Sequence, residues 1–386
     1  MEKLNILMIY SAKGFGGLPR NLSLIASRLD SRRFRLHVGL MGDPGDKAAD
    51  FRSLLDTSPD VLKSFTYLGD GKTFDFEVAK QISNLIDEHS IYVLSCHGYK
   101  ADLFGFIVKH YHGKKVKLFT IAHGWVSKTT KLKLYQTLDK FIFRFFDKVV
   151  LVSEKQFREL GSLGLDKEKV EVINNAVDIE TFSFKGPSRS LLIDLDIDPN
   201  DKKIGFAGRL SKEKGVDSAL EIFKEVLKEV PDALFVVVGD GPDHQILKQQ
   251  AEQAGISSRV IFTGYRKDMK AIYSILDVYL SCSQHEGLPN SVLEAMASGV
   301  PCVLSDIPGH NDIVVDGENG FLIDPRNAAS SAFQLVTLLN DSSLAGNIKD
   351  EARRILQKKF SISSRVQKLE KAYLSLVDEK TMVRDS

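Results

Sequence analysis

The sequence predicts an α/β protein with two domains, each built on a parallel β-sheet that helices cover on both faces. Short apolar runs alternate with stretches of helical period, and this alternation occurs in two series along the chain. A polar, proline-containing stretch from Asp178 to Asp201 separates the two series. The length of 386 residues is typical of two domains.

The first series predicts a domain over residues 1–177. Its candidate strands are Leu4–Tyr10, Leu36–Leu40, Phe65–Leu68, Ile91–Cys96, Val116–His123, Lys148–Ser153 and Val170–Asn174. The clearest helical stretches between them are Leu18–Leu29, Phe74–His89, Ala101–His110, Leu132–Phe146 and Glu154–Leu163. Because each strand is followed by a helix, we expect the strands to run parallel.

The second series predicts a domain over residues 202–360, joined to the first by a connection at 178–201. Its candidate strands are Lys203–Ala207, Leu234–Gly239, Val260–Thr263, Val278–Cys282, Cys302–Ser305 and Gly320–Ile323. Residues 361–386 form an amphipathic stretch, from Ser361 to Val377, and a tail. The carboxyl ends of parallel strands bind ligands in such sheets, so candidate site residues should follow strands.

Composition excludes several classes of protein. With 52 basic and 51 acidic residues the net charge is +1, which argues against a nucleic-acid binder. Cys96, Cys282 and Cys302 have no CxxC or metal-ligand spacing and are expected to be core residues in a reducing compartment. The N-terminus does not resemble a signal peptide, and no apolar run approaches the roughly 20 residues that span a bilayer. We therefore expect a cytoplasmic enzyme.

A basic loop bounded by Gly208 and Gly215 follows the strand Lys203–Ala207. Arg209 offers a planar guanidinium that can bind two phosphate oxygens, and Lys214 offers a mobile point charge. The loop therefore predicts a phosphate site. The alternative is a structural loop whose basic residues pair with Glu213 or Asp217.

Two glutamates bracket the turn and helix that follow the strand Val278–Cys282. Asn290 or Ser291 can cap this helix, whose first N–H groups favour an anion. Glu286 precedes the helix and Glu294 lies about one turn inside it, so their carboxylates can accept hydrogen bonds from hydroxyl groups. The alternative is a surface loop with an acid placed to favour the helix dipole. Cations for a diphosphate together with acceptors for hydroxyls predict a nucleotide-sugar ligand.

These two segments together resemble the donor site of retaining glycosyltransferases of the GT-B type, family 4. The resemblance implies two Rossmann-like domains facing a cleft, with a C-terminal helix that crosses back to the first domain. It also implies sugar transfer from a nucleoside-diphosphate donor with retention of anomeric configuration. The residues that it assigns to donor binding are Gly16, Gly17, Arg209, Lys214, Arg266, Glu286, Leu288, Asn290, Ser291 and Glu294.

Matches in the first domain are weaker. The segment Lys13–Pro19 resembles the family's N-terminal glycine loop, but Pro19 stands where a dinucleotide fingerprint needs its third glycine. His123 ends a predicted strand, and the resemblance implies contact with the transferred sugar or the acceptor; the alternative is a structural histidine. His97 occupies a similar position with less support.

The expected activity is that of a glycosyltransferase (EC 2.4) in surface polysaccharide or glycolipid assembly, with Arg209, Lys214, Glu286 and His123 as catalytic residues. The expected partners are a nucleotide-sugar and a glycan or lipid-linked acceptor. No Asp-x-Asp lies in a plausible site, so no metal and no cofactor are expected. Basic and aromatic residues over 128–146 suggest peripheral contact with the inner face of the membrane, against the alternative of a core-packed helix.

Three other functions remain open at this point. An epimerase of the GT-B type would use the same nucleotide-sugar without an acceptor. A nicotinamide oxidoreductase would also have two Rossmann-like halves, although the missing third glycine argues against it. A non-catalytic nucleotide-sugar sensor would keep the donor residues and show no turnover.

Overall fold

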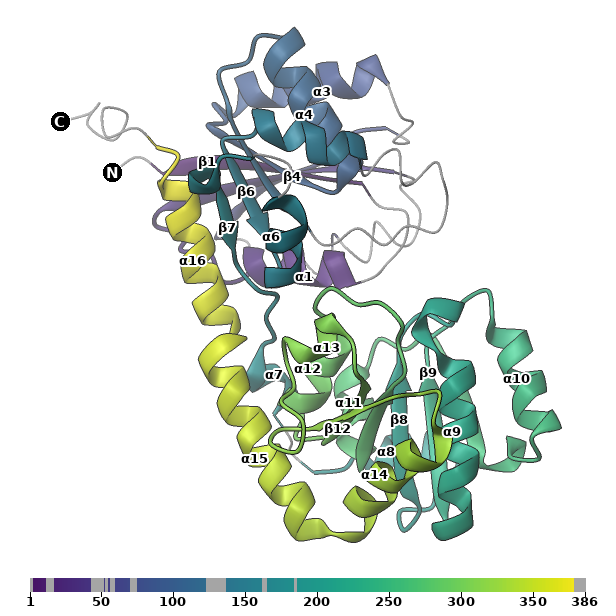
Figure 1. Ribbon diagram of the computed structural model, residues 1–386. Helices are drawn as coiled ribbons and strands as arrows, with labels where there is room; N and C mark the ends of the chain where they lie inside the picture. The colour runs from purple at the N-terminus through teal and green to yellow at the C-terminus, as the bar shows by residue number, and fades with distance from the viewer. Residues whose placement is uncertain are drawn as a thin grey trace. The chain divides into compact units, whose positions relative to one another are not determined.

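The computed structural model describes residues 3–11, 17–42, 52, 55, 60–69, 75–122, 137–161, 165–183 and 186–377. The chain forms two compact units (Figure 1). Unit 1 comprises residues 1–175 and 362–386, and unit 2 comprises residues 176–361. The sequence predicted that the first domain ends at residue 177 and that the chain returns to it from residue 361.

Unit 1 contains a seven-stranded parallel sheet with the order β3-β2-β1-β4-β5-β6-β7. Each of the predicted strands overlaps one of these strands. The bounds are β1 Leu4–Ser11, β2 Phe34–Met41, β3 Leu62–Tyr67, β4 Val93–His97, β5 Lys117–Ala122, β6 Lys148–Leu151 and β7 Val170–Val172.

Helices lie on both faces of the unit 1 sheet. On one face, Ile82 of α3 and Phe104 of α4 share a core with Leu94 of β4. On the other face, Tyr373 of α16 contacts the rings of Phe34 and Phe119. The closing helix therefore packs with the first unit, as predicted. The bounds are α1 Gly17–Ala26, α3 Phe76–Glu88, α4 Tyr99–Tyr111, η1 Phe143–Phe145, α6 Glu154–Gly161, η2 Lys167–Lys169 and α16 Ile362–Leu374; residues 137–142 are also helical.

Unit 2 contains a six-stranded parallel sheet with the order β10-β9-β8-β11-β12-β13. Alternate residues of a strand enter opposite cores: Phe235 and Val237 lie in one, Val236 and Val238 in the other. The bounds are β8 Lys202–Ala207, β9 Ala233–Val238, β10 Val260–Gly264, β11 Val278–Ser281, β12 Cys302–Ser305 and β13 Phe321–Ile323.

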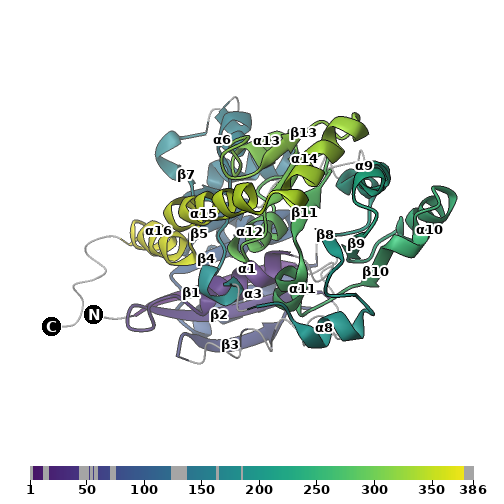
Figure 2. The same ribbon diagram turned by 90° about the horizontal axis from the view of Figure 1, so that it is seen from below.

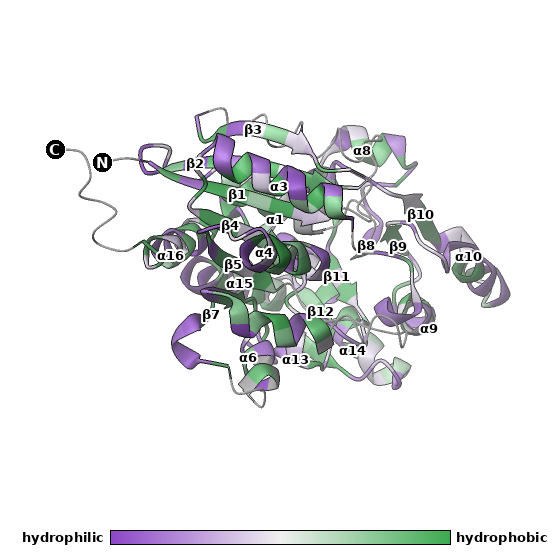
Figure 3. Cartoon of the chain, turned by 90° about the horizontal axis from the view of Figure 1, so that it is seen from above, coloured by the Kyte–Doolittle hydropathy of each residue, from purple (hydrophilic) through white to green (hydrophobic). Residues whose placement is uncertain are grey.

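The helices of unit 2 cover both faces of its sheet. Helices α9 and α14 lie side by side on one face (Figure 2), and α8, α11, α12 and α15 contribute to the core on the other. Polar and apolar residues alternate along α10 and α3 (Figure 3), as expected for helices with one buried face. The bounds are α7 Ile179–Phe182, α8 Arg189–Asp194, η3 Lys212–Lys214, α9 Val216–Glu229, α10 His244–Gln253, η4 Ser257–Arg259, α11 Met269–Ile275, α12 Asn290–Ala297, α13 Pro308–Asn311, α14 Ala328–Asn340 and α15 Ser342–Lys359.

The composition of the stretch 178–201 suggested a connection between the two domains, but the structure shows folded elements there. The stretch forms α7 and α8 and belongs to unit 2, where Leu191, Leu192 and Ile197 are buried. The side chain of Asp178 accepts a hydrogen bond from the Thr181 N–H and caps α7. Helices of four and six residues are too short to give a clear helical period, which explains why the pattern was missed.

Candidate functional site

The loop that carries Arg209 leaves the carboxyl end of β8 and is fixed by the neighbouring turn after β9. The Gly208 N–H donates to the Val238 carbonyl at 3.0 Å, and the Leu210 N–H donates to the Asp240 carbonyl at 3.0 Å. Gly239 has a φ of 130°, and a Cβ atom there would lie 1.8 Å from the Gly208 oxygen. The turn at 239–242 is therefore a structural support of this loop.

Arg209 projects from that loop into solvent. Its side chain is exposed, and it forms no hydrogen bond or ion pair with any residue that the structure describes. The guanidinium therefore keeps its donors free for a ligand.

Lys214 and Glu286, predicted as separate ligand-binding groups, form an ion pair. The Lys214 Nζ donates to Glu286 Oε1 at 2.5 Å, and the Ser283 hydroxyl donates to the same oxygen at 2.8 Å. The lysine side chain is 25% exposed and the glutamate 13%. The alternative of a structural loop named Glu213 or Asp217 as partners of its basic residues. The partner of Lys214 is instead Glu286, another predicted site residue.

Backbone contacts hold the loops after β8 and β11 together. The Gln284 N–H donates to the Glu213 carbonyl at 2.8 Å. Gly215 has a φ of 64°, and a Cβ atom at this position would lie 2.1 Å from the Cys282 oxygen. The basic loop and the acidic loop therefore meet at the carboxyl edge of the unit 2 sheet.

Helix α12 begins at Asn290 with Pro289 as its N-cap, and no side chain in the described ranges caps it. The prediction that Asn290 or Ser291 supplies the cap is therefore wrong. Both residues already lie within the helix, and the Asn290 Oδ1 atom is buried without a hydrogen-bond partner among the described residues. The first N–H groups of the helix have no side-chain cap from any described residue and can bind an anion.

Two buried tyrosines, which sequence reasoning missed, position groups of this site. The Tyr273 hydroxyl donates to Glu294 Oε2 at 3.2 Å. The Tyr279 hydroxyl donates to the Ala207 carbonyl at 3.1 Å, and burial raises the pKa of Tyr279. In sequence, tyrosines within an apolar helix and strand are not distinguishable from core residues.

A third segment, after β12, supports Glu286 from behind. The Ser305 hydroxyl donates to the Ser283 carbonyl at 2.5 Å, and a Cβ atom on Gly309 would lie 2.5 Å from the Glu286 carbonyl oxygen. His310 Nδ1 contacts the Ser305 carbonyl at 2.8 Å, and burial lowers the His310 pKa, which favours a neutral ring. The backbone of the loop that carries Ser283 and Glu286 is thus supported by residues at and after the end of β12.

Two of the predicted donor residues have side chains engaged elsewhere. Arg266 forms ion pairs with Asp268 at 2.6 Å and Asp194 at 2.9 Å, which raise its pKa. The Leu288 side chain is 5% exposed and belongs to the core beneath α12. A role in donor binding stays a prediction for both, and for Leu288 it would have to involve the backbone.

The predicted residues of unit 1 are described only in part. Gly17 is the first residue of α1, whereas Gly16 and His123 lie outside the described residues. His97 is 1% exposed, its Nε2 lies 3.1 Å from the Ser95 hydroxyl, and burial lowers its pKa to about 3. Within the described ranges of both units, no three His, Cys, Asp or Glu side chains are placed to hold a metal ion.

The free guanidinium, the lysine–glutamate pair and the open helix N-terminus offer binding groups for a phosphorylated ligand that also carries hydroxyls. Such a site on one of two Rossmann-like units defines a GT-B enzyme. The model named Glycosyltransferase Family 4 matches residues 15–181, and the model named Glycosyl transferases group 1 matches residues 191–355. The chain belongs to glycosyltransferase family 4, and it is a glycosyltransferase.

Relatives of known name cover most of the chain. The UDP-Gal:alpha-D-GlcNAc-diphosphoundecaprenol alpha-1,3-galactosyltransferase of Escherichia coli is 28% identical over 317 residues, which are 79% of this chain and 81% of that protein. The N-acetyl-alpha-D-glucosaminyl L-malate synthase of Bacillus anthracis is 26% identical over 313 residues, 80% and 81% of the two chains. The crystal structure of Anabaena HepE with UDP-glucose has the same fold, with a TM-score of 0.81 at 22% identity over 96% of this chain and all of that chain.

Proposed function

We propose that this glycosyltransferase moves a sugar from a UDP-sugar to a hydroxyl of a glycan or lipid-linked acceptor, with retention of configuration. The observation that carries the proposal is the convergence of Arg209, Lys214, Glu286 and the α12 N-terminus at one sheet edge. The names of the Escherichia coli relative and of the HepE complex support uridine as the base. Retention is supported by the family resemblance.

The proposed roles follow from charge. Arg209 binds two oxygens of the diphosphate, and Lys214 leaves Glu286 to neutralise charge that grows on the leaving diphosphate. The Glu286 carboxylate keeps the hydrogen bond that the Ser283 hydroxyl donates, and it accepts another from a sugar hydroxyl. Glu294, oriented by Tyr273, accepts from the ribose. His123 acts on the acceptor side.

We further propose that the donor binds without a metal ion. Arg209, Lys214 and the N–H groups of α12 supply the positive charge and the donors that a divalent ion would otherwise provide. No other cofactor is needed, because both substrates carry the reacting groups.

We also propose a cytoplasmic location with peripheral contact to the inner face of the membrane through residues 128–146, of which 137–146 are described. Leu138, Phe141 and Phe145 are 38%, 52% and 38% exposed, and the Arg144 guanidinium lies 5.4 Å from the Phe141 ring centre. Exposed aromatics beside cations suit an anionic lipid surface. Buried Ile142, Phe143 and Phe146 anchor the segment in the core. Among the described helices, none is long and apolar enough to span a membrane.

A nucleotide-sugar panel tests the proposed donor. We expect a UDP-sugar to raise the melting temperature of the protein, because a ligand at about 100 times its Kd adds about 2.7 kcal/mol of stability. The same UDP-sugar should release UDP when an acceptor is added, with transfer detected by mass spectrometry. If no nucleoside diphosphate and no nucleotide-sugar stabilises the protein, the proposed donor site is refuted. If the donor is epimerised without transfer to an acceptor, the protein is an epimerase.

A further inference from the structure

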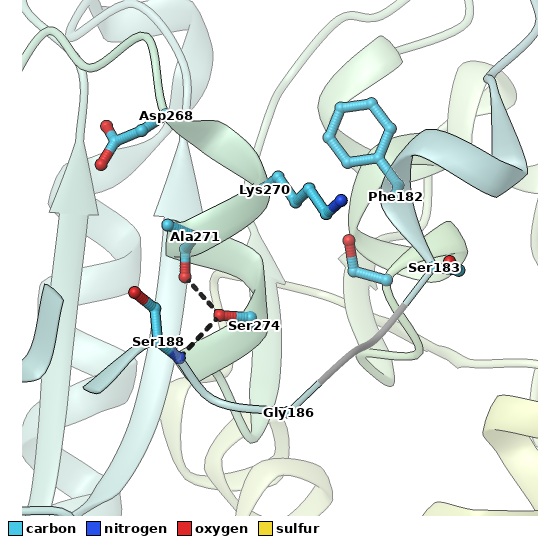
Figure 4. A pocket seen from close by; sticks show the side chains of 9 residues that line it. Phe182, Ser183, Gly186, Ser188, Asp268, Lys270, Ala271 and Ser274 are labelled. Carbon is cyan, nitrogen blue, oxygen red and sulfur yellow. Dashed lines mark hydrogen bonds between the residues drawn. The ribbon is translucent and has the colours of Figure 1, made fainter. Parts of the chain in front are cut away.

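Two cavities lie beside α11 of unit 2, and neither is lined by Arg209, Lys214 or Glu286. One, of about 350 Å³, lies between α7 and α11 (Figure 4). The other, of about 430 Å³, lies beside Lys203 at the start of β8 and Asp277 before β11. Both cavities are lined by Ser274 and Ser298, so they are neighbouring parts of one groove along α11.

The groove has an excess of uncompensated positive charge. Lys270 lines the first cavity, and Lys349 and Arg353, one turn apart on α15, line the second. None of these three forms an ion pair with any residue in the described part of the chain. The groove therefore favours an anion, provided that its carboxylates are already neutralised.

Two of the three carboxylates in the groove are already engaged. Arg266 forms an ion pair with Asp268 at 2.6 Å, and the Lys203 Nζ forms one with Asp277 at 3.7 Å. Only Asp350 is left to oppose the three cations among the described residues.

The walls of the groove suit a hydroxylated ligand. Ser298 is 3% exposed, and its hydroxyl has no hydrogen-bond partner within the part of the chain that the structure describes. A buried hydroxyl without a partner is unfavourable, so a ligand oxygen there would remove that cost. In Figure 4 the Lys270 side chain extends from α11 toward Phe182 and Ser183, so its ammonium group lies on the side of the cavity that carries an aromatic ring and a serine. Cations suit a phosphate, and hydroxyls next to an aromatic ring suit a sugar or polyol.

The groove also contacts the elements that position Glu294. Ser298 is the C-cap of α12, the helix whose first turn lies at the donor site. Tyr273 lines the second cavity, and its hydroxyl donates to Glu294. A helix of eight residues is about 12 Å long, so both ends move as one body.

We propose that this groove is a second binding site, for a phosphorylated sugar or polyol, and that its occupancy changes nucleotide affinity at the donor site. Binding in the groove does not depend on the proposed function, whereas the coupling rests on it. Because coupling is reciprocal, UDP must change the affinity of the groove by the same factor.

Calorimetry with glucose 1-phosphate tests the site in protein saturated with UDP, so that the donor site is filled. We expect binding that weakens at least tenfold in the Lys270→Glu/Arg353→Glu variant. The matched control is Lys248→Glu, the same charge change at an exposed position of α10. Arg209→Ala should leave this binding unchanged. Loss of binding in the presence of UDP, or unchanged binding in the double variant, would overturn the site.

Two further titrations identify the chemistry and the coupling. Orthophosphate and glucose should each bind more weakly than glucose 1-phosphate; equal affinity for orthophosphate would reduce the site to a phosphate site and overturn the sugar assignment. Saturating glucose 1-phosphate should change the Kd for UDP at least threefold, and the double variant should remove the change. An unchanged Kd would overturn the coupling, whereas no UDP binding at all would instead refute the proposed donor site.

Discussion

At the scale of single residues, the candidate site combines one free charge with one compensated pair. Arg209 has no partner among the described residues, while Lys214 and Glu286 neutralise each other and Ser283 adds a second hydrogen bond to the carboxylate. The sequence identified all three charged residues from their positions after strands. It could not reveal the pair, because the partners lie 72 positions apart and meet only after β8 and β11 become neighbours.

Replacing Arg209 by Ala should weaken UDP binding without changing the stability of the fold. The side chain is exposed and unpaired within the described structure, so the urea midpoint should not change. A hydrogen bond to a charged group contributes about 1.5–3 kcal/mol, so the Kd for UDP should rise by about ten- to a hundredfold. Calorimetry measures this, and an unchanged Kd would remove Arg209 from the site.

Replacing Glu286 by Gln should act in the opposite way on binding and transfer. The variant removes the carboxylate charge that holds Lys214, so affinity for bare UDP should stay the same or increase. Sugar transfer should fall at least tenfold, because the proposed acceptor for the sugar hydroxyl is weakened. Glu221→Gln, an exposed change on α9, is the control. Normal transfer by Glu286→Gln would show that this carboxylate does not act on the sugar.

Chelation of divalent metal ions tests whether protein residues alone supply the positive charge that binds the diphosphate. Since Arg209, Lys214 and the α12 N-terminus are the proposed cations and donors, transfer should persist in excess EDTA. UDP should also raise the melting temperature without added Mg²⁺. Activity that disappears in EDTA and returns with Mn²⁺ or Mg²⁺ would contradict the proposal.

At the scale of elements, the two loops of the site are joined by close backbone contact. Gly215→Ala would bring a Cβ atom to 2.1 Å from the Cys282 oxygen and would strain a φ of 64°. We expect a loss of about 1–3 kcal/mol of stability together with weaker UDP binding, because the Lys214 and Glu286 loops separate. Urea unfolding and calorimetry measure the two effects.

Gly255 offers a matched control for this variant. Its φ is 73°, but a Cβ atom there would have no neighbour within 4 Å among the residues that are described. Gly255→Ala should therefore cost only the backbone strain, about 1 kcal/mol, with UDP binding unchanged. Equal effects of both substitutions on UDP binding would show that the contact with Cys282 does not hold the site together.

The elements differed in how well their sequences predicted them. The strands of both sheets are apolar runs of ordinary length, and each predicted strand overlaps an observed one. The short helices α7 and α8 were missed because four and six residues give too little periodicity. The cap of α12 was assigned wrongly because Asn290 has the favoured residue type but lies inside the helix, where Pro289 holds the cap position.

At the scale of the whole molecule, buried histidines make stability depend on pH. His97 lies at the end of β4 within the unit 1 core, where burial and the Arg365 charge lower its pKa to about 3. Its unfolded pKa is about 6.5, so below that pH the unfolded chain binds a proton that the folded chain does not. Stability contributed by neutral His97 is therefore present above pH 6.5 and is lost as the pH falls toward 3.

This linkage predicts a measurable acid sensitivity. Between pH 7 and pH 5, His97 should account for a loss of about 2 kcal/mol in the free energy of unfolding. Replacement by Gln, which has no titrating group, should reduce the difference between the urea unfolding free energies at the two pH values by that amount, whatever its effect at pH 7. The exposed His285→Gln substitution should leave the difference unchanged. A His97→Gln variant with the parent's pH dependence would show that the imidazole takes up a proton in the folded state, and that the core around β4 admits a charge.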